Sequence, residues 1–372
     1  MAKKKLLIAS DTFLPRWDGV TRFLLEVVPK LSLRYDITLA VPDFKGKSVK
    51  IKNVGIVKIP VHDFVVDDMH LPKFKFSMTK RLVSESDLVF IQSLGPIGML
   101  AARYADRLKK PLYSYAHMVE WDLYPNVVGR FKSMIRSVTL LLSRHFYNKC
   151  DVIFVPSEDI EKTLIYSRIE PQKKVIPLGI DGEEFMPPAD KAKAKDKVSI
   201  DPGSIIIGFA GRIGWEKNLE TLEKAFRILQ KRYNGSIKLL IVGSGIGLER
   251  MFKSMEGVIH IEATHKVADY LQAMDIFVMP SLAETSSLAT MEAMSCGLPV
   301  VATSVGCIPF YVKEGKNGYL FPPKDFAMLA KKLSKLIDSP ELRKAIGSVA
   351  RKTVTTRYSW DRTIKDIEAM LG

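Results

Sequence analysis

The sequence predicts an α/β protein built from two doubly wound, Rossmann-like domains that face each other across a cleft. Three observations support this fold class. A chain of 372 residues is long enough to form two separate cores. Short apolar runs alternate with amphipathic stretches along almost the whole chain, as strands and helices do around parallel sheets. The alternation is interrupted once, at a polar stretch rich in lysine and proline, and then restarts.

The interruption marks the expected domain boundaries. We expect an N-terminal domain at 1–185, a linker at 186–203 and a C-terminal domain at 204–372, whose last helix could pack back on the N-terminal domain. In the N-terminal domain, a first helix is expected from Gly19 to about Leu33, and apolar runs predict strands at 5–9, 36–41, 55–59, 87–91, 112–115 and 152–156. In the C-terminal domain they predict strands at 204–210 and near Leu239, Val258, Ile276 and Val300.

Polar residues gather at one edge of the predicted sheets. Ligands of doubly wound proteins bind at the carboxyl ends of the strands. Residues 11–19, His117, residues 212–217 and Glu284 each follow a predicted strand. They are therefore candidate site residues on position alone.

The composition indicates an ordinary globular protein of a reducing compartment. Hydrophobic residues make up 47% of the chain and charged residues 26%. Cys150, Cys296 and Cys307 are odd in number and lack paired ligand spacing, so they predict neither a disulfide framework nor a zinc site. The apolar run at 6–9 is too short for a secretion signal, and no run approaches the roughly 18 residues of a membrane span. We therefore expect a cytoplasmic protein whose membrane contact, if any, is peripheral.

The net charge of +15 is unevenly distributed. Residues 1–177 contain 29 Lys/Arg and 18 Asp/Glu, a net charge of +11, whereas residues 178–372 contain 27 and 23, a net charge of +4. A basic N-terminal half indicates an anionic partner, which could be a membrane surface, a nucleic acid or a phosphorylated substrate. The basic residues are spread over many elements without a recognition helix, so we expect no nucleic acid. No P-loop and no metal-ligand cluster is present in the sequence.

Two glutamates eight positions apart are the most informative feature of the sequence. Glu284 follows the apolar run 275–280, and Glu292 lies about two turns along the helix that Ser286 or Ser287 can cap. Amides at a helix start bind phosphate, so two acids beside them suit a nucleotide-sugar, which carries phosphates and many hydroxyls. Two solvated glutamates are the plain alternative. A glycosidase pair is less suitable, because eight helical residues span about 12 Å and such carboxylates lie about 5 to 9.5 Å apart.

The longer string around these glutamates resembles the signature of the retaining glycosyltransferases of family 4, which have the GT-B fold. The string is Glu284-x7-Glu292 followed by Ala-Met-x-x-Gly-x-Pro-Val-Val-Ala302. The resemblance implies that Glu284 binds the sugar hydroxyls and Glu292 the ribose, and that the amides of Ser287 and Leu288 hold phosphate. It further implies a nucleotide-sugar donor without a bound metal. The family usually has glycine where Ser287 stands, so the sugar preference could differ.

Two further segments contribute to the predicted donor site. Arg212 and Lys217 follow the strand 204–210, and the resemblance implies that they bind the donor diphosphate and stabilise it as it leaves. The alternative is that Lys217 begins a solvated helix. Gly19 lies between the first strand and first helix, where a backbone can approach phosphate closely. The family usually has two glycines here, and Asp18 replaces the first, so Gly19 could equally serve only to form the turn.

His117 is the candidate for contact with the sugar near the acceptor. It follows the strand 112–115, and the resemblance implies that a histidine at this site is needed for transfer. Titration near neutral pH would suit such a role. A lone histidine is also common as a structural residue, so both interpretations stay open. With Glu284, Arg212 and Lys217, His117 completes the set of predicted catalytic residues.

A glycine-rich turn offers a competing interpretation. Gly243, Gly245 and Gly247 follow a strand, and Glu262 lies 19 residues after the first, as in an NAD-binding fingerprint. The spacing is Gly-x-Gly-x-Gly, however, and Leu248 stands where a third glycine is expected. An NAD-dependent oxidoreductase is therefore the weaker alternative.

Basic and apolar residues interleave in two segments of the N-terminal half, 71–81 and 126–149. Such segments bind anionic lipid surfaces, although a core-packed helix with a basic face has the same pattern. The order of motifs resembles the membrane glycolipid synthases of the family, which glycosylate diacylglycerol or phosphatidylinositol. We therefore expect transfer of a hexose from a UDP- or GDP-sugar to a lipid at the cytoplasmic face of the membrane. A soluble sugar or sugar phosphate is the alternative acceptor, and the oligomeric state is left open.

Overall fold

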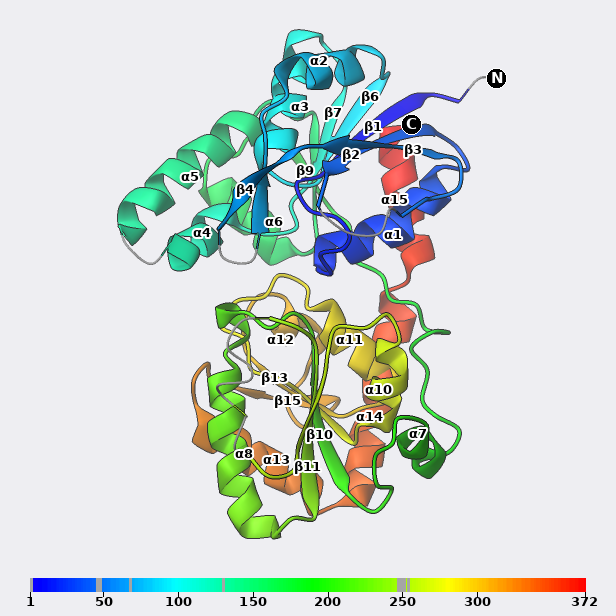
Figure 1. The fold of residues 1–372 in the computed structure, drawn as a ribbon, viewed down its shortest axis with the longest axis vertical. Coiled ribbons are helices and arrows are strands. Elements are labelled where there is room, and N and C mark those ends of the chain that lie inside the picture. Colours follow the sequence, from blue (N-terminus) through cyan, green and yellow to red (C-terminus); the bar gives the residue numbers. More distant parts are fainter. Residues whose placement is uncertain (1–2, 45–48, 67–68, 129–130, 246–251, 253–254) are drawn as a thin grey trace. The chain divides into compact units, whose positions relative to one another are not determined.

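The computed structural model describes residues 3–44, 49–66, 69–128, 131–245, 252 and 255–372. The chain divides into two compact units. Unit 1 comprises Met1–Pro177 together with Trp360–Gly372, and unit 2 comprises Leu178–Ser359. Each unit contains a parallel sheet with helices packed on it (Figure 1). The predicted α/β class with two doubly wound domains is confirmed.

The sheet of unit 1 has the strand order β3-β2-β1-β6-β7-β8-β9, and every neighbouring pair is parallel. The strands are β1 (Lys5–Ala9), β2 (Asp36–Pro42), β3 (Val54–Ile59), β6 (Leu88–Ile91), β7 (Leu112–Tyr115), β8 (Val152–Val155) and β9 (Gln172–Val175). The chain runs outward from β1 to β3 and then returns to β6 on the other side of β1. This reversal makes the β1/β6 junction the topological switch point of the sheet.

Unit 1 also contains a hairpin and seven described helices. The hairpin pairs β4 (Val61–Val66) with β5 (Met69–Pro72) in antiparallel fashion. The helices are α1 (Gly19–Leu31), α2 (Phe76–Ser84), α3 (Pro96–Arg107), α4 (Glu120–Val128), α5 (Lys132–Tyr147), α6 (Glu158–Tyr166) and the last helix of the chain, α15 (Trp360–Leu371). Helix α15 lies beside α1 (Figure 1), where Asp361 forms an ion pair with Lys30 at 2.7 Å.

The sheet of unit 2 has the order β12-β11-β10-β13-β14-β15, again with parallel neighbours throughout. Its strands are β10 (Ile205–Ala210), β11 (Ile237–Val242), β12 (Val258–Ile261), β13 (Ile276–Met279), β14 (Val300–Thr303) and β15 (Gly318–Phe321). The switch point lies between β10 and β13. Their buried apolar runs hold the two strands in the centre of the core and bring the loops that follow them to one edge.

The helices of unit 2 flank this sheet on both sides (Figure 1). The described ones are α7 (Lys191–Lys197), the short 3₁₀ helix η1 (Trp215–Lys217), α8 (Leu219–Tyr233), α10 (Val267–Ala273), α11 (Leu288–Ser295), α12 (Ile308–Tyr311), α13 (Phe326–Ile337) and α14 (Pro340–Arg357). Helix α8 packs with α13, and α11 packs with α14.

The polar stretch 186–203 lies inside unit 2 and carries α7. Two of its lysines are bound by that unit. The Lys195 side chain is only 5% exposed and lies 2.8 Å from Oδ2 of Asp275, and Nζ of Lys191 donates to the carbonyls of Gln272 and Met274. Burial lowers the pKa of Lys191. A lysine-rich composition is typical of a solvated linker, whereas here the ammonium groups satisfy carboxylate and carbonyl oxygens of a folded domain.

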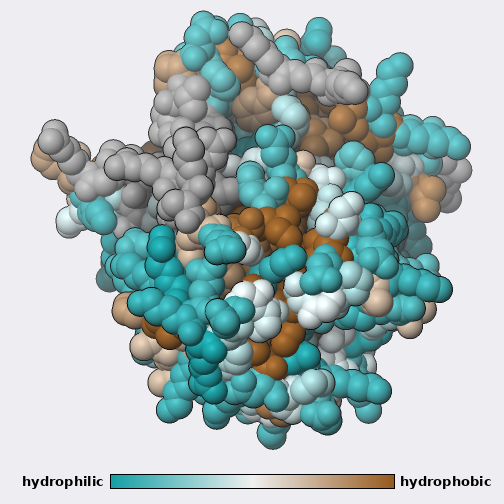
Figure 2. Space-filling view, turned by 60° about the horizontal axis from the view of Figure 1, so that its bottom comes forward, coloured by the Kyte–Doolittle hydropathy of each residue, from teal (hydrophilic) through white to brown (hydrophobic). Residues whose placement is uncertain are grey.

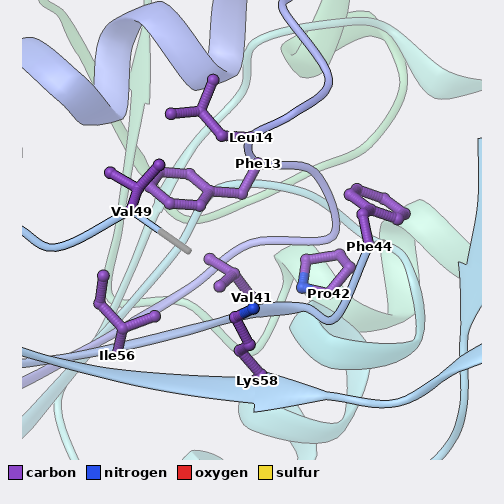
Figure 3. A pocket seen from close by; sticks show the side chains of 8 residues that line it. All are labelled: Phe13, Leu14, Val41, Pro42, Phe44, Val49, Ile56 and Lys58. Atoms are coloured by element: carbon purple, nitrogen blue, oxygen red, sulfur yellow. The ribbon is translucent and has the colours of Figure 1, made fainter. Parts of the chain in front are cut away.

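Figure 2 shows a face on which hydrophilic side chains predominate and apolar ones gather in patches. A cavity of about 10 Å³ lies beside the end of β2 (Figure 3), lined by Phe13, Leu14, Val41, Pro42, Phe44, Val49, Ile56 and Lys58. That volume suits one water molecule at most, so this cavity is not a donor site.

Two classes of site find no support in the described parts of the chain. No helix there combines the length and apolar character needed to cross a bilayer. No group of three histidine, cysteine, aspartate or glutamate side chains there is arranged to hold a metal ion.

Candidate active site

The loops that follow β10 and β13 meet at the switch point of unit 2. Nζ of Lys217 lies 2.6 Å from Oε1 of Glu284, which also accepts from Oγ of Ser281 at 2.7 Å. The backbone N–H of Leu282 donates to the carbonyl of Glu216 at 2.7 Å and ties the two loops together. Two of the predicted donor-site residues, 67 positions apart in sequence, are thus in direct contact.

Arg212 is held by a neighbouring carboxylate. Its guanidinium group forms an ion pair with Oε1 of Glu216, a residue that is only 6% exposed. A side chain at Gly214 would come within 2.4 Å of Oε2 of Glu216, so this glycine leaves room for the carboxylate. The alternative of a solvated helix start at 216–217 does not describe these residues, because Glu216 is buried and the Lys217 side chain is 17% exposed. Sequence reasoning missed Glu216, whose position between Arg212 and Lys217 was the only available signal.

The N-terminus of α11 has amides available for an anion. Ser287 occupies the cap position with φ 54°, and its hydroxyl bonds to that of Thr290 at 2.8 Å instead of a backbone amide. The expectation that a serine side chain caps this helix is therefore wrong. Within the described parts of the chain, no hydrogen bond engages the amides of Leu288 and Ala289. The left-handed backbone at Ser287 is a conformation that glycine adopts more readily than serine.

Glu292 lies closer to the helix start than the sequence indicates. Helix α11 begins at Leu288, so Glu292 is just over one turn along it, and Glu284 lies in the preceding loop. The expected distance of two turns from the helix start is wrong, because the backbone of Ser287 is left-handed and the helix begins only at Leu288. Glu292 is half-buried. Burial first, and then the nearby Glu292 carboxylate, raise the pKa of the Cys296 thiol to about 12, which favours the protonated thiol at neutral pH.

The glycine-rich turn after β11 packs tightly against the loop that carries Arg212. A side chain at Gly243 would lie 1.9 Å from the carbonyl oxygen of Gly211, and one at Gly245 would lie 1.8 Å from that of Ile213. These two glycines are therefore required by backbone packing, without any dinucleotide. Residues 247–249 of the fingerprint lie outside the described residues.

In unit 1, His117 is buried and neutral. Nε2 of His117 lies 3.0 Å from Oε1 of Gln92, and the ring stacks on Tyr115 at a centroid distance of 4.3 Å. Burial lowers the pKa of His117 to about 3. The expectation that His117 titrates near neutral pH is therefore wrong, because no charged partner offsets the loss of water in this site. A neutral imidazole can still accept a hydrogen bond from a sugar hydroxyl or donate one to it.

Asp18 occupies the N-terminus of α1, next to Gly19. Oδ1 of Asp18 accepts from the amide of Thr21 at 2.9 Å, and Oδ2 accepts from Thr12 Oγ1 at 2.7 Å and Arg16 Nε at 3.1 Å. A side chain at Gly19 would meet nothing within 4 Å. The helix start is capped by a carboxylate, and the predicted contact of Gly19 with phosphate stays a prediction.

Buried Asp11 has a structural role. Its carboxylate accepts from the hydroxyl of Ser93 and from the amides of Gly95, Ile97 and Gly98 at 2.7 to 3.1 Å. It therefore caps α3 from the loop after β1. Burial raises the pKa of Asp11, an effect that the three amides and the hydroxyl oppose.

The segment 126–149 contains the end of α4 and the whole of α5, with residues 129–130 outside the described residues. Large apolar side chains are exposed along α5: Met134 is 59% exposed, Val138 49% and Leu141 62%. Their spacing of four and three residues places them on one stripe of the helix. The alternative of a core-packed helix fails for this stripe. Part of the basic charge is neutralised, because Arg136 pairs with Asp122 and Lys149 with Asp106.

The second segment, 71–81, also exposes aromatic and basic side chains. Phe74 and Phe76 are each about half exposed and stack on one another at a centroid distance of 6.0 Å. Lys75, Lys80 and Arg81 are exposed as well. Unit 1 therefore carries two surface regions that combine apolar and cationic groups.

Comparison with known families gives one match in the N-terminal half of the chain and one in the C-terminal half. Residues 17–184 match the family described as Glycosyltransferase Family 4, and residues 190–353 match the family described as Glycosyl transferases group 1. Together the two matches cover the sequence around Gly19, His117, Arg212, Glu284 and Glu292.

Curated relatives of the chain are glycosyltransferases according to their names. The chain is 31% identical to sulfoquinovosyl transferase SQD2 of Arabidopsis thaliana over 76% of its own length and 57% of that protein. It is 25% identical, over 96% of its length and 95% of the relative, to a GDP-mannose-dependent phosphatidylinositol monomannoside mannosyltransferase of Mycobacterium tuberculosis. It is also 31% identical to a D-inositol 3-phosphate glycosyltransferase of Stackebrandtia nassauensis, over 58% of its length and 52% of that protein. The chain thus spans about half the length of the first relatives it matches.

Solved structures share the fold over the full chain. Sucrose-phosphate synthase from Thermosynechococcus elongatus superposes with a TM-score of 0.80 at 18% identity, covering 100% of this chain and 98% of that one. HepE of Anabaena in complex with UDP-glucose also gives 0.80, at 17% identity and 99% coverage of both chains. At these identities the likeness concerns the fold, which is the GT-B fold.

Proposed function

The chain belongs to the glycosyltransferases that combine a family 4 domain with a group 1 domain in the GT-B fold, and on this premise we propose that it is a retaining hexosyltransferase. It moves a hexose from a UDP- or GDP-sugar to a lipid acceptor. The C-terminal domain binds the nucleotide-sugar and the N-terminal domain the acceptor. The observation that carries the proposal is the contact of Lys217 with Glu284 beside the free amides of α11.

Each group around this contact has a role in the proposed reaction. Arg212 and Lys217 bind the diphosphate of the donor, and the amides of Ser287 and Leu288 hold one of its phosphates. Glu284 accepts from hydroxyls of the sugar and Glu292 from those of the ribose. Gly19 lets the backbone approach the donor at the start of α1.

The reaction balances without a bound metal. The bond between the anomeric carbon and the diphosphate oxygen breaks, and the acceptor oxygen forms the new bond on the same face of the sugar. The acceptor proton passes to the departing diphosphate, whose charge Arg212, Lys217 and the α11 amides stabilise. His117 remains neutral and contacts the sugar near the acceptor.

The lipid acceptor is supported by the surface of unit 1 and by the relatives. The apolar stripe of Met134, Val138 and Leu141, with the basic aromatic segment 71–81, suits the surface of an anionic bilayer. The phosphatidylinositol monomannoside mannosyltransferase among the relatives is consistent with this acceptor class. We therefore place the enzyme peripherally at the cytoplasmic face of the cell membrane. The D-inositol 3-phosphate relatives favour a soluble sugar phosphate as the second candidate acceptor.

A transfer assay tests the proposal directly. Radiolabelled UDP- and GDP-hexoses are each incubated with the protein and with vesicles of diacylglycerol, vesicles of phosphatidylinositol, or soluble inositol phosphate. Product in the lipid phase, with the anomeric configuration of the donor by NMR, is the expected result. An inverted product would refute the retaining assignment, and product only with the soluble acceptor would refute the lipid.

Vesicle flotation tests the membrane surface separately. Because each basic residue near an anionic bilayer contributes about 1 kcal/mol, binding is expected at low ionic strength and release at high salt. Serine at Met134, Val138 and Leu141 should reduce flotation. The control carries serine at Ile228 and Val349, which are also exposed apolar residues but belong to unit 2. Equal flotation of the two variants would contradict the assigned surface.

A further inference from the structure

The side-chain amide of Gln92 is buried in unit 1, next to His117 and outside the set of proposed site residues. Gln92 follows β6 directly, and its backbone N–H donates to the carbonyl of Ala9 at 2.9 Å, so that strand pairing fixes its position. The residue is 1% exposed. Oε1 of its side chain lies 3.0 Å from Nε2 of His117, which comes shortly after the neighbouring strand β7. Nε2 of Gln92 is buried and, within the described parts of the chain, has no hydrogen-bond partner.

The contact determines which nitrogen of His117 carries the proton. An amide oxygen can only accept, so the imidazole donates from Nε2. A neutral imidazole has one N–H, and therefore Nδ1 carries no hydrogen and can only accept. Because burial keeps the ring neutral, this tautomer persists across the physiological pH range.

The other neighbours of the ring do not compete with Gln92. Tyr115 stacks on it, and Phe23 contacts it edge-on at a centroid distance of 4.8 Å. The hydroxyl of Tyr115 is already committed to the carbonyl of Ile176 at 2.7 Å. The aromatic rings hold the imidazole plane, and the amide holds its tautomer.

We propose that Gln92 is a positioning residue that fixes His117 in the Nε2–H tautomer and leaves Nδ1 as a hydrogen-bond acceptor for a hydroxyl of the bound sugar or acceptor. The unpartnered Nε2–H of Gln92 donates to a second hydroxyl of the same substrate, since a buried amide donor without a partner is uncommon outside functional sites. This inference rests on the proposed glycosyl transfer and adds to it a residue that no motif identifies.

The tautomer can be measured without substrate. The full-length protein is labelled with ¹⁵N-histidine, and the signals of His117 are assigned by their loss in a His117→Gln variant. Long-range proton–nitrogen spectra should show a protonated Nε2 and a bare Nδ1 from pH 5 to 8. In Gln92→Met the acceptor is gone, and the Nδ1–H tautomer should become populated. A wild-type ring in the Nδ1–H form, or a Gln92→Met ring that keeps Nε2–H alone, would overturn the proposal.

Two further variants separate positioning from packing. Gln92→Glu keeps the shape but places a carboxylate beside the imidazole, which should raise the His117 pKa and bring a titration into the range from pH 5 to 8. Ser86→Ala is the control, because it removes a buried hydroxyl hydrogen bond just before the amino end of the same strand. It should leave both the tautomer and the pH profile of transfer unchanged. Absence of any His117 titration in Gln92→Glu would count against direct contact.

The kinetic consequence is a loss in kcat. Gln92→Met should lower kcat by about tenfold to a hundredfold, the range given for loss of a partner that orients a metal-ligating histidine. A wild-type kcat in this variant would refute the role in transfer. Since the spectra need no substrate, a failed tautomer test counts against Gln92 alone. A wild-type protein inactive with every donor and acceptor counts against the proposed function instead.

Discussion

Replacing Glu284 with Gln should separate binding of the sugar from binding of the diphosphate. In the structure, Oε1 of Glu284 accepts from Lys217 at 2.6 Å and from Ser281 at 2.7 Å, and the Glu284 side chain is only 8% exposed. Gln keeps an acceptor for Ser281 but removes the charge that holds Lys217. In this variant, Lys217 does not have to break an ion pair with residue 284 before it binds a diphosphate.

The size of the effect follows from the groups involved. A hydrogen bond to a charged group contributes about 1.5 to 3 kcal/mol, which corresponds to roughly tenfold to a hundredfold in affinity. Loss of the carboxylate should weaken the nucleotide-sugar by about this factor, because the sugar hydroxyls lose a charged acceptor. Affinity for free UDP or GDP should stay the same or become tighter.

Calorimetry with both ligands measures the difference. The control is Glu220→Gln, which makes the same chemical change in a salt bridge with Lys224 at 2.6 Å on the exposed face of α8. It should alter neither affinity. Equal weakening of the nucleoside diphosphate and the nucleotide-sugar by Glu284→Gln would refute the assignment of Glu284 to the sugar.

The other predictions concern the donor site, the cap residue of α11 and a buried carboxyl. Arg212→Ala and Lys217→Ala should each lower the rate of transfer about a hundredfold, as loss of one preorganised hydrogen-bond donor does, and near-normal activity in both single variants would refute their roles. Glu292→Ala should weaken the binding of both the free nucleoside diphosphate and the nucleotide-sugar. Ser287→Gly should be more stable than Ser287→Ala by about 1 kcal/mol in chemical unfolding, because both lose the hydroxyl but only glycine suits a φ of 54°. Glu120 is buried, its Oε1 accepts from the Tyr147 hydroxyl at 2.7 Å, and burial raises its pKa to about 7. As the pH rises, Glu120 ionises in the unfolded state before it ionises in the folded state, so the folded state loses stability between about pH 4.5 and 7. Glu120→Gln should therefore be more stable than the wild type by roughly 3 kcal/mol at pH 8 but not at pH 4. A gain in stability that does not depend on pH would contradict this reasoning.

The chain order of apolar and amphipathic segments was enough to predict the fold class. Each buried strand of a parallel sheet is a short apolar run, and runs such as 205–210 and 276–279 stand out because both of their faces are covered. The hairpin strands β4 and β5 are not predicted, and neither are two strands of the parallel sheets that lack such a run. β9 contains Lys173 and Lys174, and β15 is a four-residue strand that includes Gly318. Composition predicts a linker at 186–203, because it does not reveal that Lys195 is buried against Asp275.

The sequence by itself also identified the family signature and the residue types of the donor site, since these lie within short segments after single strands. Only the tertiary structure decided which of them touch. Lys217 meets Glu284 because β13 lies beside β10 in the sheet, and Gln92 meets His117 because β6 lies beside β7. The burial of Glu216, the neutrality of His117 and the left-handed backbone of Ser287 depend in the same way on neighbours distant in sequence. Periodicity reports whether a residue faces a core, whereas strand order determines which side chains share an edge of the sheet, and no local pattern encodes that order.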